Sequence, residues 1–262
     1  MTSTEASMYP IVAPPPMPPQ PRPPQAWKFI GTSLWGLAVF VAMFAGQLSV
    51  LAYFVLTDPA PFSFDKVTEH AGDGLTVALS VVAGLPMALL ALWIPIRLSG
   101  VSLADYLALR WISWRHLLLG IAALVALVLG WEGVFYAMGH ETSAGFVVDV
   151  LNSARAEGAL WLLVIAICVV APVTEELLTR GFLYRGWSES ALRPAGAIVL
   201  SSLVWTAMHL QYDPFFFAEV FSIGLLFGYL RYRSGSILLT VILHGLNNLA
   251  ATLQTLWIAG HS

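Results

Sequence analysis

Seven apolar segments, each near the length of a membrane crossing, constrain this chain more than any other feature. A bilayer core about 30 Å thick requires about 20 apolar residues per helix. The 262 residues are 58% hydrophobic and 10% charged, whereas soluble domains carry about 25% charged residues. The sequence therefore predicts an all-α polytopic membrane bundle of about seven transmembrane helices, at Phe29–Leu56, Leu75–Ile96, Leu117–Met138, Ala159–Thr179, Pro194–Leu210, Phe215–Leu230 and Ser236–Ile258.

The parts outside these spans suggest two regions, a tail at 1–27 and a membrane domain at 28–262. The tail is rich in proline and has no apolar core, which predicts a disordered or extended cytoplasmic segment. Whether it is only solvated or binds a PxxP-reading partner stays open. Residues 101–116 place Leu103, Leu107 and Trp111 at helical spacing, which predicts an interfacial amphipathic helix. We expect a second interfacial elbow over 182–193.

The basic residues predict the orientation of these helices. Cytoplasmic loops of membrane proteins carry an excess of Lys and Arg. With the N-terminus inside, ten of the twelve basic residues fall on the cytoplasmic side, and only Lys66 and Arg155 fall outside. The expected location is the bacterial inner (plasma) membrane, with a cytoplasmic N-terminus. A net charge of −3 argues against a nucleic-acid partner.

The fourth apolar segment ends in the charged stretch TEELLTR. Ionisable residues within a membrane are costly and commonly functional. Glu176 and Arg180 are four residues apart, so they share one side of a helix and can pair. Glu175 lies about 100° around the helix and has no such partner. The stretch is either an interfacial charge cluster or the source of a general base.

Two further apolar segments also carry polar groups. His209 ends the fifth segment, and His244 and Asn248 are four residues apart on one face of the seventh. Each group alone is compatible with a role in helix packing. Their combination with the two carboxylates favours a hydrolase-type site, provided that the three helices converge at one depth. Glu132 and Glu219 also lie in apolar segments, outside these three motifs.

The three motifs resemble those of the CPBP family, which comprises CAAX-type prenyl proteases and bacteriocin-processing enzymes and is also called the ABI family. The family pattern is EExxxR, then F/WxxxH, then HxxxN/D. This chain has Glu175-Glu176-x-x-x-Arg180, Trp205-x-x-x-His209 and His244-x-x-x-Asn248. Tryptophan stands where phenylalanine is common. The similarity covers a protease-like core at about 159–251.

The resemblance implies an intramembrane endopeptidase. By analogy, Glu175 activates a water with help from His209, while His244 and Asn248 stabilise the developing oxyanion. Arg180 would hold Glu176 and orient the helix end. The family is commonly described as metal-dependent, and His209, His244 and Glu175 would make a plausible zinc set. A metal-free mechanism based on glutamate stays equally open.

The expected substrates are peptides or membrane-anchored proteins, prenylated or not. The first alternative is a non-proteolytic membrane scaffold or bacteriocin-immunity protein whose polar residues serve packing. A proton-coupled transporter is less favoured, because no internal repeat accompanies the buried acids. Membrane lipid is the one partner that composition implies; the sequence does not specify the substrate or the oligomeric state.

Overall fold

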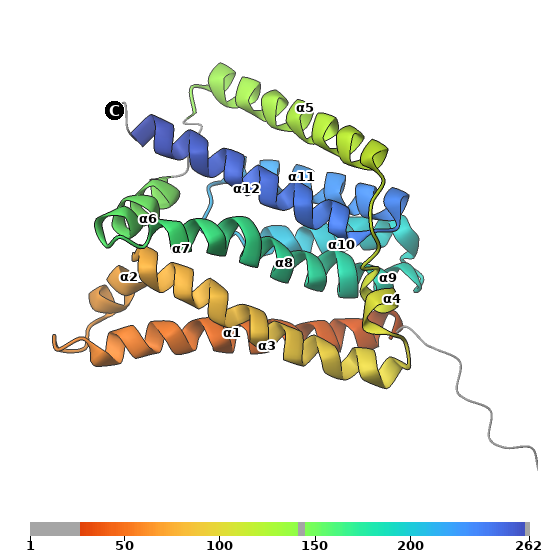
Figure 1. The fold of residues 1–262 in the computed structure, drawn as a ribbon, viewed down its shortest axis with the longest axis horizontal. Coiled ribbons are helices and arrows are strands. Elements are labelled where there is room, and N and C mark those ends of the chain that lie inside the picture. The colour runs from red at the N-terminus through yellow and green to blue at the C-terminus, as the bar shows by residue number, and fades with distance from the viewer. Residues whose placement is uncertain (1–26, 141–144, 260–262) are drawn as a thin grey trace, which may run out of the picture.

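The computed structural model describes residues 27–140 and 145–259, and all regular secondary structure in these residues is helical (Figure 1). The predicted all-α membrane bundle is confirmed. The predicted tail, apart from Trp27, lies outside the described residues. The helices are α1 Lys28–Thr57, α2 Phe64–Gly72, α3 Gly74–Ser99, α4 Leu103–Leu107, α5 Trp114–Met138, α6 Gly145–Ala156, α7 Leu160–Ile165, the π-helix η1 Ala166–Val170, α8 Ala171–Glu176, the π-helix η2 Leu177–Leu183, α9 Tyr184–Ser188, α10 Arg193–Ala207, α11 Pro214–Ser234 and α12 Ile237–Ala259.

In the described part of the chain, six helices rather than seven are long and apolar enough to cross a membrane: α1, α3, α5, the continuous rod from α7 to α9, α11 and α12. The missing span is α10, which has 15 residues. It ends at Ala207, and the chain passes through turns before Asp213 caps α11. The start of α1 and the end of α12 nevertheless lie at opposite ends of the bundle (Figure 1).

Both predicted interfacial segments differ from the structure. The first is helical over only five residues, since Ala108 adopts a left-handed conformation that ends α4. Its Tyr106 is buried and stacks on Phe182 of η2, with ring centroids 5.5 Å apart. The expected elbow is instead a continuation of the central rod, in which Phe182 and Trp187 are buried. Tyr106 and Leu107 of the first segment and Phe182 and Trp187 of the second therefore contribute to the core of the bundle, whereas Trp111 and Trp114 are exposed.

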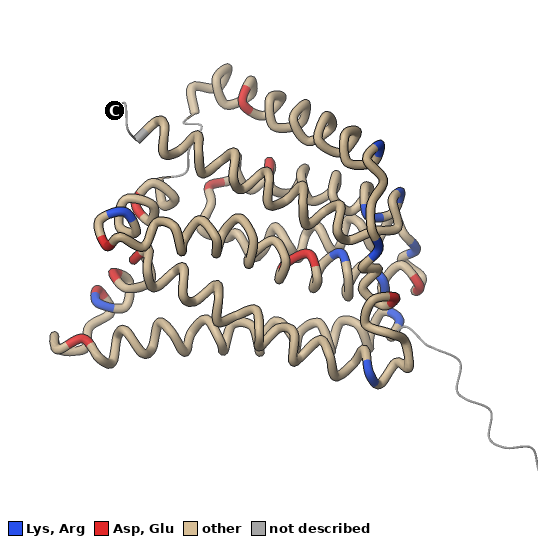
Figure 2. The backbone as a smooth tube through the Cα atoms, viewed as in Figure 1, with Lys and Arg blue, Asp and Glu red and all other residues tan. Residues whose placement is uncertain are grey.

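Charged residues are distributed unevenly along the bundle. Lys and Arg gather mainly at the end where α1 begins, and the end formed by α2 and α6 is richer in Asp and Glu (Figure 2). This arrangement agrees with the predicted positive-inside pattern, and the assignment of the basic end to the cytoplasm stays a prediction.

The rod from α7 to α9 is the central element, packed against α3 on one side and α12 on the other. It contains two π-helical segments, η1 and η2, on either side of the two glutamates. Pro172 has no N–H for the Cys168 carbonyl, and its ring disfavours a regular turn there. Such widened turns frequently occur at functional sites.

Candidate functional site

A fully buried ion pair anchors the site. Glu176 and Arg180 have no exposed surface, and Arg180 Nη1 donates to Glu176 Oε1 at 2.9 Å. Arg180 also donates from Nη2 to the backbone carbonyl of Gly224, at 3.2 Å. His244 Nδ1 on α12 lies 3.2 Å from the same Glu176 oxygen. The pairing predicted from the i, i+4 spacing is therefore present, and it joins the rod to α11 and α12.

The sequence had indicated that Glu175 lacks a partner. In the structure it has one. Trp205 Nε1 on α10 donates to Glu175 Oε2 at 2.6 Å. His244 Nε2 lies 3.9 Å from the same oxygen. One imidazole thus contacts Glu176 through Nδ1 and faces Glu175 through Nε2. The Glu175 side chain keeps 16% of its surface exposed, whereas Glu176 is fully buried.

His209 lies just beyond the end of α10, next to this cluster. Its Nδ1 is 2.9 Å from the backbone carbonyl of Trp205. The Trp205 ring lies between the two histidines, with centroids 5.2 Å from His209 and 5.2 Å from His244. The structure therefore brings His209 to the same aromatic ring as His244, with Trp205 in contact with both.

Asn248 has a structural contact that the sequence did not reveal. Its Nδ2 donates to the Ile167 carbonyl in η1 at 2.7 Å. The neighbouring Gly245 allows the same close approach, because a Cβ there would lie 2.7 Å from the Cys168 carbonyl oxygen. Asn248 of the HxxxN motif thus holds α12 against η1. An amide nitrogen carries two N–H donors, so one remains for other chemistry.

The predicted zinc set is not assembled as a metal-binding group. Among the described residues, no three His, Cys, Asp or Glu side chains are arranged to hold a metal ion. His244 Nδ1 is engaged by Glu176 and His209 Nδ1 contacts a backbone carbonyl, so Nε2 is the nitrogen that each ring presents to other groups. In the described residues, Glu175, His209 and His244 are therefore not gathered as a His₂Glu site.

Trp205 is the site residue whose contact with Glu175 the sequence did not predict. In the sequence it was noted only as the first position of the F/WxxxH pattern. The indole N–H, a hydrogen-bond donor within an apolar segment, was the feature that could have indicated a polar partner. Gly224 was also missed. Its lack of a side chain lets α11 approach, since a Cβ would lie 3.1 Å from Trp205 Cε3 and 3.3 Å from Arg180 Nη2.

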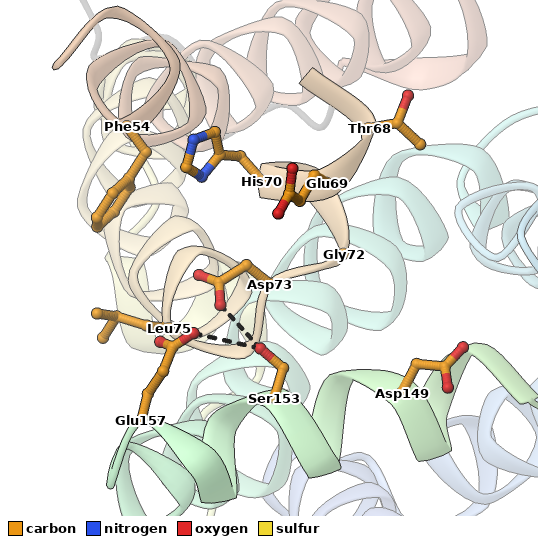
Figure 3. A pocket seen from close by; sticks show the side chains of 10 residues that line it. All are labelled: Phe54, Thr68, Glu69, His70, Gly72, Asp73, Leu75, Asp149, Ser153 and Glu157. Carbon is orange, nitrogen blue, oxygen red and sulfur yellow. Dashed lines mark hydrogen bonds between the residues drawn. The ribbon is translucent and has the colours of Figure 1, made fainter. Parts of the chain in front are cut away.

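A separate cavity of about 580 Å³ lies between α2, α3 and α6 (Figure 3). Most of its lining residues are polar or charged, and none of them is a motif residue. Ser153 Oγ on α6 donates to Asp73 Oδ1 at 2.8 Å and lies 3.3 Å from Glu157 Oε1. Asp73 also caps α3 by accepting from Thr76 N at 2.9 Å. The cluster links the start of α3 to the end of α6.

This cluster predicts a pH-dependent stability. A hydrogen bond to Asp73, with some desolvation, raises the pKa of Glu157 from 4.5 to about 7. Burial opposes ionisation of Asp73, but hydrogen bonds from Glu157 and Thr76 outweigh it and lower its pKa to about 2. Because the raised pKa of Glu157 belongs to the folded state, its stabilisation is complete below about pH 4.5 and is lost as pH rises through about 7.

We expect the melting temperature in detergent to fall between pH 5 and 8 in the wild type and to fall less in Glu157→Gln. The glutamine amide can donate to Asp73 at every pH in this range. Glu189→Gln, an exposed acid at the basic end, serves as the control. An identical pH dependence in wild type and Glu157→Gln would contradict the assignment.

Three comparisons with known proteins bear on the segment that carries this site. Residues 157–250 match the family model of the type II CAAX prenyl endopeptidases, Rce1-like. An Escherichia coli protein described as an uncharacterized 24.3 kDa protein is 36% identical over 86 residues, which is 32% of this chain and 39% of that protein. The chain thus matches about two fifths of the length of this curated relative. No solved structure matches.

The matched segment contains all three motifs and every residue of the cluster around Glu175. The likeness to CAAX-type proteases that the motifs suggested is therefore confirmed for the part of the chain that forms the site. Over residues 157–250, about a third of its length, this chain is similar to the type II CAAX prenyl endopeptidases, Rce1-like.

Proposed function

We propose that this chain is an intramembrane endopeptidase that hydrolyses peptide bonds of membrane-associated substrates. One observation carries the proposal: a partly exposed carboxylate, Glu175, faces an imidazole whose other nitrogen contacts a buried ion pair. A carboxylate held in this way can take a proton from water, as a general base does. The match to the CAAX prenyl endopeptidases supports the same chemistry.

In the proposed reaction, Glu175 removes a proton from a water that attacks the substrate carbonyl carbon. His209 assists from the end of α10. The negative charge that develops on the carbonyl oxygen is stabilised by His244 and by the second N–H of Asn248. Collapse breaks the C–N bond, and the proton held by Glu175 passes to the leaving amine. Arg180 acts indirectly, by holding Glu176 against His244.

The proposed substrates are peptides or membrane-anchored proteins that approach from the basic end of the bundle, which we assign to the cytoplasm. The name of the matched family makes prenylated peptides a class to test. Two of the three motifs have basic residues close by in the sequence. Arg185 follows Arg180, and Arg231 and Arg233 precede the start of α12.

The test is hydrolysis by purified protein in detergent, using prenylated and unprenylated peptides in water enriched in ¹⁸O. We expect cleavage products with ¹⁸O in the new carboxyl group. Treatment with a chelator should leave the rate within about twofold, because the donors do not form a metal set, and metal analysis of the same preparation checks this. Absence of cleavage from every peptide class would contradict the proposal. Proton-coupled uptake of a solute into liposomes that contain the protein would instead favour the transporter hypothesis.

A scaffold or immunity role is the second candidate, and the bond from Asn248 to the Ile167 carbonyl favours it. If packing is the sole role of this residue, Asn248→Ala should lower the melting temperature along with any activity. If Asn248 also acts on the oxyanion, Asn248→Ala should lower kcat more than the fraction of folded protein. Comparing the two quantities in one preparation separates the roles.

A further inference from the structure

The inference concerns how the proposed base is held, and it rests on the proposed function. In the described part of the chain, the hydrogen bond from Trp205 Nε1 at 2.6 Å is the one that the Glu175 side chain receives. Trp205 is 2% exposed, so water competes little for this bond. Hydrogen bonds to ionised groups are shorter and stronger than neutral ones. The indole is therefore the main group that fixes the orientation of the carboxylate.

The indole ring is itself held from several sides. The Arg180 guanidinium carbon lies 4.5 Å from the ring centroid, within the range of a cation–π contact. His209 and His244 meet the ring edge-on, at interplanar angles of 72° and 82°. The backbone of Gly224 closes another side, where a Cβ would lie 3.1 Å from the ring. A ring restrained in this way can aim its N–H in only one direction.

We propose that Trp205 is a positioning residue that fixes Oε2 of Glu175 through its indole N–H. The other oxygen, Oε1, is then free to accept the proton from the attacking water. This positioning role requires the indole N–H and not only an aromatic ring. It therefore does not extend to chains that have phenylalanine at the first position of the F/WxxxH pattern. Trp205 makes no contact with reacting atoms in this scheme.

The first test compares Trp205→Phe with wild type on a cleaved peptide. Phenylalanine keeps an aromatic ring for Arg180 and both histidines but removes the N–H. We expect kcat to fall about 10- to 100-fold, with KM changed by less than about threefold, because the lost bond affects the base and not substrate binding. Trp161→Phe, the same substitution at a 67% exposed position of the rod, should keep wild-type kcat.

A second variant guards against a folding artefact. Benzothienylalanine at position 205 retains the bicyclic ring and replaces the N–H with sulfur, so it should lower kcat to a similar extent. Wild-type kcat in both variants, in a preparation where Glu175→Gln is inactive, would overturn the positioning role while leaving the protease proposal intact.

A third readout does not require activity. Carbodiimides modify protonated carboxyl groups in apolar surroundings, and mass spectrometry of peptides identifies the modified residue. Removing the indole donor releases Oε2 of Glu175 from its hydrogen bond, so we expect Glu175 to be labelled several-fold faster in Trp205→Phe than in wild type, with Glu219 labelling unchanged. Equal labelling rates at Glu175 would overturn the inference, whether or not a cleaved peptide has been found.

Discussion

Replacing Arg180 by methionine is expected to lower the free energy of unfolding by about 3–5 kcal/mol, since it leaves a buried carboxylate without its cation. Glu176 and Arg180 have no exposed surface, so water cannot replace the lost partner. The substitution also removes the bond to the Gly224 carbonyl and the contact over the Trp205 ring. Unfolding in mixed micelles of detergent and SDS, followed by far-UV circular dichroism, measures the change.

Two variants complete this experiment. Arg110→Met breaks a pair with Asp105 at 3.8 Å in which both side chains are 67% exposed, and such pairs contribute about 0–1 kcal/mol. Glu176→Gln combined with Arg180→Met removes both charges and should recover part of the lost stability. The interpretation fails if Arg180→Met costs no more than Arg110→Met.

Glu175→Gln is expected to lower kcat by about 10³-fold or more while the protein remains folded. Glutamine has nearly the same shape as glutamate, but its amide cannot take a proton from water, and general-base catalysis contributes about 10²–10⁴-fold. The glutamine oxygen can still accept the hydrogen bond from Trp205 Nε1. KM should therefore change little, and the melting temperature should stay within a few degrees of wild type.

The matched control is Glu219→Gln on α11. Glu219 is a partly buried acid in another apolar helix and lies outside the three motifs. It should keep at least half of the wild-type kcat. Full activity of Glu175→Gln would exclude this residue as the base, and an equal loss in both variants would indicate a general need for intramembrane charge.

The sequence predicted those parts of the site that depend on spacing within one helix. The i, i+4 rule placed Glu176 against Arg180, and the structure has that ion pair. The same rule placed His244 and Asn248 on one face of α12. It could not say that they contact different elements, because the bond of Asn248 to the Ile167 carbonyl depends on how closely α12 approaches the rod.

The parts that the sequence did not predict are set by contacts between distant segments. Hydropathy found the apolar segments well, but it counted α10 as a full span because Met208, Leu210 and their neighbours continue the apolar run past the end of the helix. Amphipathic spacing suggested an interfacial helix at 101–116, whereas Tyr106 is buried against η2. Periodicity reports which face is apolar and not what covers it.

The two widened turns beside the glutamates have a consequence for how this segment can vary. Each residue added to or removed from a regular helix rotates everything beyond it by about 100°. A π-turn holds one residue more than an α-turn, so loss of one residue from η1 can be absorbed by conversion to a regular turn, which keeps Glu175 and Glu176 facing α12. A single deletion between Ala166 and Val170 should therefore be tolerated better than one in the regular α7, where it would turn both glutamates away from α12.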